Sequence, residues 1–254
     1  MNIAVLAKLV PDLVEELTID SSGTKLDTAF ARFIINEFDD HAIEEAILLK
    51  ERLGGQVTIV AADDEGVDEV LFTAAAKGAD RLIKLAGISA VENSNHALAR
   101  VFADVVSELK PDLVLTGVQA HNDMDGSVGG LVAAMLELPY LGYVSGITAQ
   151  DGQATLRKEY PGGLIGEYQV ATPAVVGVQA GEQPPRYVAV SKVRQAMKSC
   201  TIEDRPSSAP EATADLQIER MYKPEPAEHA TMIEGSPEEI AEKLVGIFKE
   251  VGVL

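Results

Sequence analysis

The chain has 254 residues, of which 46% are hydrophobic, so it can bury the core of one large α/β domain with an appendage. Its 40 acidic residues against 21 lysines and arginines give a formal net charge of −19, which excludes nucleic acid and anionic membranes as favourable partners. Cys200 is the only cysteine, so no internal disulfide points to an oxidising compartment.

The segment NIAVLAKLV (2–10) is a nearly continuous apolar run. It predicts a buried parallel strand and not a signal peptide, because no basic lead precedes it and no cleavage-type ending follows it. No apolar stretch reaches the roughly 20 residues that a membrane-spanning helix needs. We therefore expect a cytoplasmic protein, or a mitochondrial matrix protein in a eukaryote, that does not insert into membranes.

Apolar runs and helical periodicity then alternate up to residue 150. Residues 17–27 predict a small hairpin with its turn at Ser22-Gly23. Further strands are expected at 56–62, 81–85, 112–117 and 142–150. Helices are expected at 36–55, 65–80, 93–112 and 126–138, the first with a capping box of Asn36 and Asp39. This alternation predicts an α/β fold with a doubly wound, Rossmann-like parallel sheet of strand order 3-2-1-4-5.

After residue 150 the pattern changes to short strands separated by Gly and Pro turns. These strands are expected as antiparallel additions to the sheet, at 154–160, 164–172 and 173–180.

The remainder of the chain has a different character. Residues 181–230 are rich in proline and lose periodicity, which predicts a linker or arm. The segment 236–254 predicts an amphipathic helix with Ser236 as its N-cap. We therefore expect one α/β domain over residues 1–180, followed by an arm and a terminal helix over 181–254.

The stretch TGVQAHNDMDGSVGG (116–130) joins the fourth strand to the fourth helix. It lies where the expected strand order reverses, and open parallel sheets bind ligands at this point, beyond the carboxyl ends of their strands. Gly117 would let the chain turn close to a ligand, and the N–H groups of residues 126–128 at the helix start would favour an anion. The segments Asn36–Asp39 and Ala62–Asp63 can line the same rim.

Other chemistry fits this loop less well. Asp123 and Asp125 are expected to accept backbone N–H groups and hold the loop rather than bind a divalent ion, because Ala134 stands where a calcium loop has its closing glutamate. Ser127 is not in a nucleophile elbow, because a glycine directly precedes it. The sequence contains neither of the two common phosphate-binding motifs, G-x-x-x-x-G-K-[ST] and G-x-G-x-x-G. His121 has no obvious nucleophile beside it, so we predict no catalytic residue.

Five segments, in order and in register, resemble the beta subunit of electron transfer flavoproteins. NEFDDHAIEEAILLKE resembles the family's N-P-F-x-E-x-A-x-E-E-A helix start, and AAAKGADRLIKL resembles its A-x-x-x-G-A-D-R segment. DLVLTGVQAHNDMDGSVGGLVAAMLELP resembles the D-L-V-L-x-G-x-Q-A-x-D-x-D loop and the helix after it. PGGLIGEYQVATPAVVGV resembles the D-G-G-L…L-P-A-V-V passage, and EQPPRYVAV resembles N-E-P-R-Y. The match extends over nearly the whole chain.

The resemblance implies an electron carrier and not an enzyme, with an adenine-nucleotide-binding fold and a tight heterodimer with an FAD-bearing alpha subunit. The beta subunit holds AMP or, in electron-bifurcating members, a second FAD. The family's partner-docking loop, which dehydrogenases recognise, has an anchoring leucine that falls at Val190. The implied nucleotide contacts are Leu6, Asn36, Glu37, Phe38, Asp39, Ala62, Gly117, Val118, Gln119, Ala120, His121, Asn122, Asp123, Met124, Asp125, Gly126, Ser127 and Val128.

Some residues depart from the family pattern. Glu37 replaces the proline of N-P-F, Val128 replaces a common threonine and so removes a hydroxyl donor, and VSKVRQAMKSC replaces a more basic run. The segment Asn36–Asp39 still resembles the AMP-holding members, so we favour AMP over FAD in this chain. Two other functions stay open: an electron-bifurcating subunit with its own FAD and NADH site, and a nucleotide-sensing, stress-type binding protein of the same fold.

Overall fold

The computed structural model describes residues 1–90, 94–207, 218–225 and 230–254. The chain divides into two compact units, Met1–Glu219 and Arg220–Leu254.

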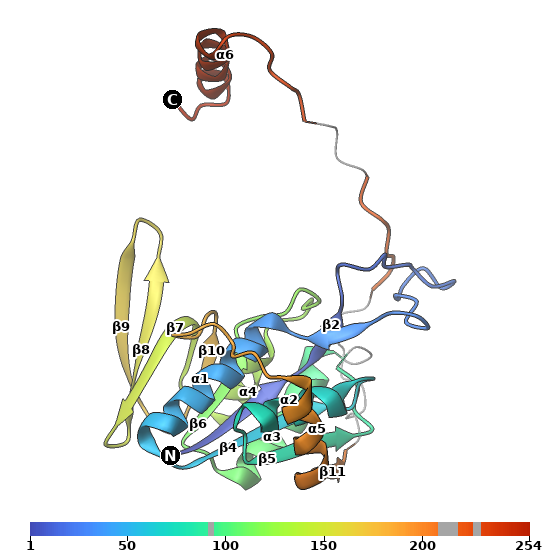
Figure 1. The fold of residues 1–254 in the computed structure, drawn as a ribbon, viewed down its shortest axis with the longest axis vertical. Helices are drawn as coiled ribbons and strands as arrows, with labels where there is room; N and C mark the ends of the chain where they lie inside the picture. The colour runs from blue at the N-terminus through green and yellow to red at the C-terminus, as the bar shows by residue number, and fades with distance from the viewer. Residues whose placement is uncertain (91–93, 208–217, 226–229) are drawn as a thin grey trace. The chain divides into compact units, whose positions relative to one another are not determined.

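The larger unit is a mixed sheet covered by helices (Figure 1). Its strands within the described residues are β1 (Asn2–Ala7), β2 (Leu9–Pro11), β3 (Phe33–Ile35), β4 (Gln56–Ala62), β5 (Arg81–Ala86), β6 (Leu113–Gly117), β7 (Tyr140–Gln150), β8 (Gln153–Tyr160), β9 (Leu164–Ala171), β10 (Ala174–Val178) and β11 (Ile202–Pro206). Its helices are α1 (Glu37–Leu53), α2 (Val67–Lys77), α3 (Asn95–Leu109), α4 (Val128–Leu136) and α5 (Val190–Ser199). The sheet order is β11-β5-β4-β1-β6-β10-β7-β8-β9, and β2 pairs separately with β3.

The predicted fold class is confirmed, because β5, β4, β1 and β6 are adjacent, parallel and in the expected order. The fifth position differs from the prediction. It is taken by β10, which runs parallel to both β6 and β7, so the segment 173–180 is not an antiparallel addition. The physical reason is burial: all five residues of β10 are buried, and a continuous apolar run fits a parallel strand covered on both faces. The chain is antiparallel, as expected, from β7 through β8 to β9.

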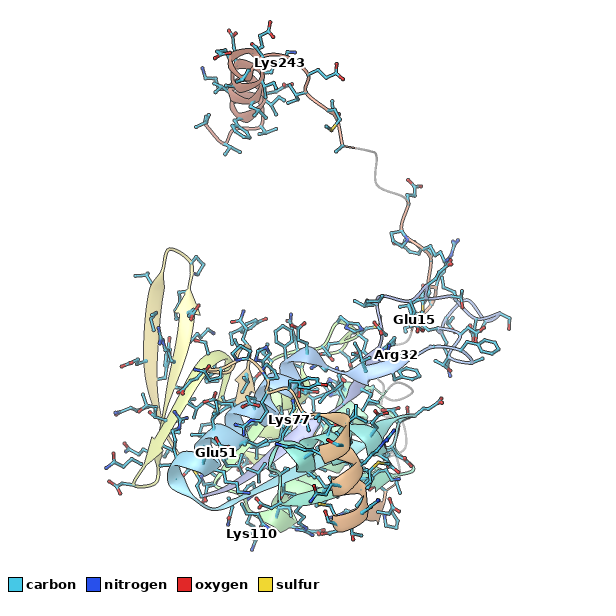
Figure 2. All side chains as sticks on the ribbon, in the orientation of Figure 1. Glu15, Arg32, Glu51, Lys77, Lys110 and Lys243 are labelled. Carbon is cyan, nitrogen blue, oxygen red and sulfur yellow. The ribbon has the colours of Figure 1, made fainter. Side chains whose placement is uncertain are left out.

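Helices cover both faces of the central parallel strands β4, β1, β6 and β10, whose residues are almost all buried. Val5 of β1 shares a core with Ile43 of α1 and with residues of α2. Its neighbour Leu6 shares the other core with Phe102 of α3 and with residues of α4. Lys77 of α2, labelled in Figure 2, forms an ion pair with Asp40 of α1 and joins the two helices on the first face.

Of two local predictions near the N-terminus, one needs correction and one is confirmed. The apolar run 2–10 is not one strand, because the chain leaves the main sheet after Ala7 and β2 pairs antiparallel with β3. The small hairpin predicted at 17–27 is confirmed: Ile19 pairs antiparallel with Leu26, and the N–H of Asp20 donates to the carbonyl oxygen of Lys25 at 3.0 Å across the turn.

The predicted irregular arm is wrong for its first part. Within 181–230, helix α5 packs against α2, and β11 extends the sheet parallel to β5. Hydrophobic periodicity does not predict these two elements, because α5 buries only Ala196 and because charged side chains hold β11 in place. Arg81 Nε lies 2.6 Å from a Glu203 oxygen, and Arg205 lies 2.5 Å from one of Glu108. Residues 208–217 and 226–229 of the predicted arm lie outside the described residues.

The smaller unit contains α6 (Pro237–Glu250), as predicted. Ser236 accepts a hydrogen bond from the Glu239 N–H, and the Glu239 side chain accepts one from the Ser236 N–H, so the two form a capping box. No helix in the described part of the chain is long and apolar enough to cross a membrane.

Replacement of Ala196 by Asp should release α5 from α2, because the side chain is 5% exposed and a charge there would have no partner. We expect the backbone amides of residues 190–199 to exchange at least about tenfold faster than in the wild type, measured by hydrogen–deuterium exchange mass spectrometry. The matched control is Gln195→Asp, which adds the same charge to the exposed neighbouring position. Unchanged exchange in Ala196→Asp would contradict this packing.

Candidate functional site

The loop after β6 lies against the first turn of α1, and a glycine makes this contact possible. A Cβ atom at Gly117 would lie 2.5 Å from Asp39 Oδ1 and 2.7 Å from the Cβ of Phe38. Because real Cβ atoms do not approach other atoms so closely, only glycine fits here. The carboxyl ends of β1 and β6 and the start of α1 therefore meet at one edge of the sheet, where the sequence predicted a ligand.

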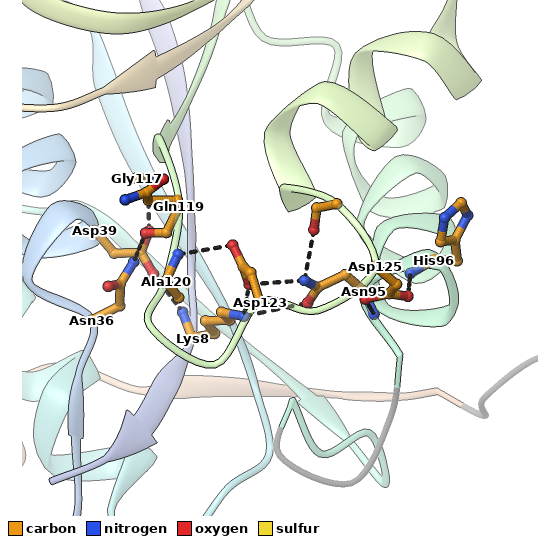
Figure 3. A network of polar contacts seen from close by, with 11 residues as sticks. Lys8, Asn36, Asp39, Asn95, His96, Gly117, Gln119, Ala120, Asp123 and Asp125 are labelled. Carbon is orange, nitrogen blue, oxygen red and sulfur yellow. Dashed lines mark hydrogen bonds and ion pairs between the residues drawn. The ribbon is translucent and has the colours of Figure 1, made fainter. Parts of the chain in front are cut away.

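A buried carboxylate holds these three elements together. Asp39 Oδ1 accepts the N–H of Gly117 at 2.7 Å, and its Oδ2 accepts the N–H of Lys8 at 3.0 Å (Figure 3). Burial raises the pKa of Asp39 from its ordinary 3.8 to about 6, although the two N–H donors and the Lys8 charge act in the opposite direction.

The predicted capping box of Asn36 and Asp39 is wrong. No side chain caps the first turn of α1, because both residues are directed to other partners. Asp39 binds the strand ends, and the Asn36 amide donates to the carbonyl oxygen of Gln119 at 2.9 Å. This bond fixes the beginning of the loop that follows β6.

The first acidic residue of the loop is neutralised by a lysine that the sequence did not single out. Lys8 Nζ lies 2.5 Å from Asp123 Oδ1 and 3.2 Å from Asn95 Oδ1. Asp123 also accepts the Ala120 N–H at 2.8 Å and the Asn95 amide at 2.8 Å. The pair is largely buried, with exposed side-chain fractions of 6% for Lys8 and 13% for Asp123. The carboxylate is thus an internal support of the loop, and its charge is compensated.

The second acidic residue of the loop supports a neighbouring helix. Asp125 accepts the N–H groups of Asn95 and His96, at 3.2 and 3.3 Å, in the first turn of α3 (Figure 3). The Asn95 amide in turn donates to the Gly126 carbonyl at 2.7 Å. The prediction that Asp123 and Asp125 accept backbone N–H groups and hold the loop is therefore confirmed.

The N-terminus of α4 is left without a cap. The Ser127 side chain makes no capping hydrogen bond, and the first N–H groups of a helix have no partner within it. Beneath this turn lies Thr116, whose buried Oγ1 atom has no hydrogen-bond partner in the described part of the chain. Gly129 allows the close approach, because a Cβ atom there would overlap Thr116 Oγ1. The arrangement offers hydrogen-bond donors to an anion.

Two cavities flank the loop. The smaller, of about 20 Å³, lies on the β1 side and is lined by Leu6, Ala7, Lys8, Asn36, Asp39, Phe102, Thr116, Gly117, Gln119, Asp123 and Val128. The larger, of about 500 Å³, lies on the β7 and β8 side and is lined by Val118, Gln119, Asp123, Met124, Gly126, Ser127, Tyr140, Gly142, Tyr143 and Lys158. Only the larger cavity falls in the range of about 300–1,000 Å³ that small-molecule ligands occupy.

Most of the predicted contact residues meet at these cavities, but not all. Glu37 is exposed, Phe38 packs against Gly117, and Ala62 is buried in the core beneath. The remaining predicted residues belong to the same loop without lining either cavity: Ala120, His121, Asn122 and Asp125. The prediction missed several polar or aromatic residues from other segments: Lys8, Asn95, Thr116, Tyr140, Tyr143 and Lys158. Lys8 carried a signal, as a lone charge at the end of an apolar strand.

Val190 begins α5 and is 61% exposed. The segment before it is fastened to α1: the Gly181 N–H donates to His41 Nδ1 at 3.2 Å, and the Arg186 guanidinium lies 2.7 Å from Glu44 and 2.6 Å from Glu51. The hydrogen bonds that the Arg186 guanidinium donates to Glu51 and Glu44 raise the pKa of Arg186. These contacts hold the predicted docking position at the surface.

Comparison with known proteins decides the family. The model of the electron transfer flavoprotein domain matches residues 25–210. The chain belongs to the electron transfer flavoprotein family. It is 32% identical to the electron transfer flavoprotein subunit beta of Methylophilus methylotrophus over 261 residues, with 98% of each chain covered.

Two further proteins with the same name are similar to this chain over nearly its whole length. The subunit beta of Bacillus subtilis is 27% identical over 254 residues, with 98% of each chain covered. The subunit beta of Syntrophomonas wolfei is 30% identical over 245 residues, covering 96% of this chain and 95% of the relative. The resemblance to the beta subunits of this family of electron carriers is therefore borne out over nearly the full length.

The raised pKa of Asp39 predicts a pH dependence of stability. Between its ordinary value of 3.8 and about 6, the folded chain binds a proton that the unfolded chain has lost. The free energy of unfolding that this proton contributes is therefore fully present below pH 3.8. It is lost as the pH rises through about 6, the pKa of Asp39 in the folded chain. Going from about pH 7 to about pH 5 should stabilise the wild type relative to Asp39→Asn in urea unfolding.

The control for this prediction is Glu37→Gln, on the same helical turn but exposed, which should follow the wild type at both pH values. If Asp39→Asn and the wild type show the same pH dependence, the raised pKa is wrong.

Proposed function

We propose that this chain is the nucleotide-holding beta subunit of a heterodimeric electron carrier. It binds the adenine nucleotide at the loop 117–128, and it clamps an FAD-bearing alpha subunit that exchanges electrons with dehydrogenases and a quinone-linked or other acceptor. The observation that carries the proposal is the uncapped, glycine-rich start of α4, which follows the loop at the switch point of the sheet and lines a cavity of about 500 Å³ on the β7 and β8 side.

The charges of the site support an anionic ligand in spite of the acidic loop. Asp123 is paired with Lys8 and Asp125 with the N-terminus of α3, so neither carboxylate is left uncompensated. The N–H groups at the start of α4 then meet a phosphate without a competing internal anion. Ser127 can supply the hydroxyl donor that Val128 lacks, because both residues lie in the same turn.

The nucleotide is AMP or FAD. AMP is favoured by the similarity of Asn36–Asp39 to the AMP-holding members of the family. The second candidate, a bifurcating subunit with its own FAD, is favoured by the extent of the larger cavity, which continues past α4 to Tyr143 and Lys158. Both ligands share the adenosine monophosphate moiety that the loop would hold. The composition of the chain suits a cytoplasmic location.

Two surfaces are suited to partners. Helix α6 carries Leu244, Val245, Ile247 and Phe248 on one side, each 36–43% exposed, and an exposed apolar face of this kind marks an interaction site. We assign it to the alpha subunit. The exposed start of α5 at Val190, held by Arg186, is assigned to the dehydrogenases.

Replacement of Gly126 by Val should abolish nucleotide retention. Gly126 has a φ of 110°, which a β-branched residue adopts poorly, so the loop would turn its N–H groups away from the ligand. Nucleotide released from the purified, denatured chain is quantified by chromatography. The matched control is Gly152→Val in the β7–β8 turn, where φ is 76° and no atom lies within 4 Å. Equal nucleotide content in the two folded variants would count against the loop.

Replacement of Phe248 by Asp should weaken the complex with the co-purifying alpha subunit about tenfold or more, because a charge would enter an apolar interface. Surface plasmon resonance measures the affinity. Gly246→Asp adds the same charge to the opposite, polar side of α6, where a new side chain meets open space, and should bind like the wild type. An unaffected Phe248→Asp complex would remove α6 from the interface.

A further inference from the structure

The segment that joins β10 to α5, residues 181–189, runs across α1 without forming a helix or a strand (Figure 1). We call this segment the strap. None of its residues is buried, and none of its apolar side chains belongs to either hydrophobic core. Burial of apolar surface, which stabilises the rest of the larger unit, therefore does not hold the strap in place.

The strap is bound through its backbone to three acceptor side chains of α1. Two of these acceptors, Glu44 and Glu45, are only 2% and 0% exposed. A buried carboxylate needs hydrogen-bond donors, and the strap supplies them at both of its ends. The N–H groups of Gly181, Glu182 and Arg186 donate to His41 Nδ1 at 3.2 Å, to Glu45 Oε2 at 3.0 Å and to Glu44 Oε2 at 2.9 Å, respectively.

Two arginines add charged contacts between the strap and α1. The guanidinium of Arg186, in the strap, lies 2.7 Å from Glu44 and 2.6 Å from Glu51. The guanidinium of Arg52, in α1, lies 2.7 Å from Glu182. Apart from Glu44, the side chains of these pairs are 31–53% exposed. Such pairs are individually weak and are screened by salt.

Detachment of the strap would replace polar contacts by contacts with water and would expose little apolar surface, since none of its residues is buried. Burial raises the pKa of Glu45, although the N–H of Glu182 acts in the opposite direction. Hydration of this carboxylate would therefore offset part of the hydrogen bonds that are lost. Segments with few apolar contacts open locally, at a free energy below that of global unfolding.

We propose that the strap detaches from α1 as one cooperative unit while the larger unit stays folded, and that its release lets the start of α5 move relative to the sheet. Tyr187 and Val190, which are 89% and 61% exposed, would move with it. The consequence for partner docking rests on the proposed function, in which Val190 meets the dehydrogenases. The detachment itself is a property of this chain alone.

The test is hydrogen exchange of the full chain, resolved for single amides by NMR. Arg186→Gln removes both ion pairs at one end of the strap. It should accelerate the amides of Gly181, Glu182 and Arg186 together, about tenfold or more, while the amides of β10 keep their wild-type rates. Acceleration of Gly181, which is bound to His41 at the other end, identifies a single unit. In the wild type, raising the salt from about 0.1 to about 1 M should accelerate the same amides.

The matched control is Arg205→Gln. This arginine has a side chain 30% exposed, against 31% for Arg186, and it pairs with Glu108 away from the strap, so the strap should exchange as in the wild type. Glu51→Gln removes only the exposed partner of Arg186 and provides the test if Arg186→Gln does not fold. It should accelerate the same three amides by a smaller factor.

Two results would overturn the proposal. If only the amide of Arg186 is accelerated, the strap does not open as a unit. If the amides of the strap and of β10 are accelerated equally, the opening is global unfolding. Either result leaves the proposed function standing, because Gly126→Val and Phe248→Asp test nucleotide retention and alpha-subunit binding separately.

Discussion

The site depends on one buried carboxylate. Asp39 accepts the N–H of Gly117 at the end of β6 and the N–H of Lys8 just after β1, and so ties α1 to the two strands at the switch point of the sheet. An ionised carboxylate is the group best suited to accept two such donors, and burying it opposes ionisation, which is why its pKa is raised to about 6. The glycine at position 117 is the steric counterpart of this contact, because any Cβ there would occupy the space of Asp39.

The second constraint is charge compensation within an acidic loop. Lys8 comes from β1, Asp123 from the loop and Asn95 from α3, so three segments far apart in sequence share one polar network. Breaking a largely buried ion pair by removing one partner is costly, since the remaining charge is left unpaired. The network therefore engages both carboxylates of the loop with partners inside the chain, and the proposed anion would meet the N–H groups at the start of α4.

Much of this could be predicted from sequence, and the failures have identifiable causes. The strand 56–62 and the helix Asn95–Leu109 follow from hydrophobic pattern, and the position of the loop 117–128 follows from strand order. The place of β10 was missed because chain order suggested antiparallel pairing, although its unbroken apolar run already indicated a central strand. The position of Lys8 at the end of an apolar strand is visible in the sequence, but its ion pair with Asp123 joins two distant segments, and a single sequence does not show which segments meet.

The central claim is that this chain, and not only its partner, holds an adenine nucleotide. The most direct measurement is to denature the purified complex with the alpha subunit and count the released cofactors by chromatography. We expect, for each heterodimer, one FAD from the alpha subunit and one further adenine nucleotide, either AMP or a second FAD, from the site beside Gly126. A single FAD with no second nucleotide would contradict it.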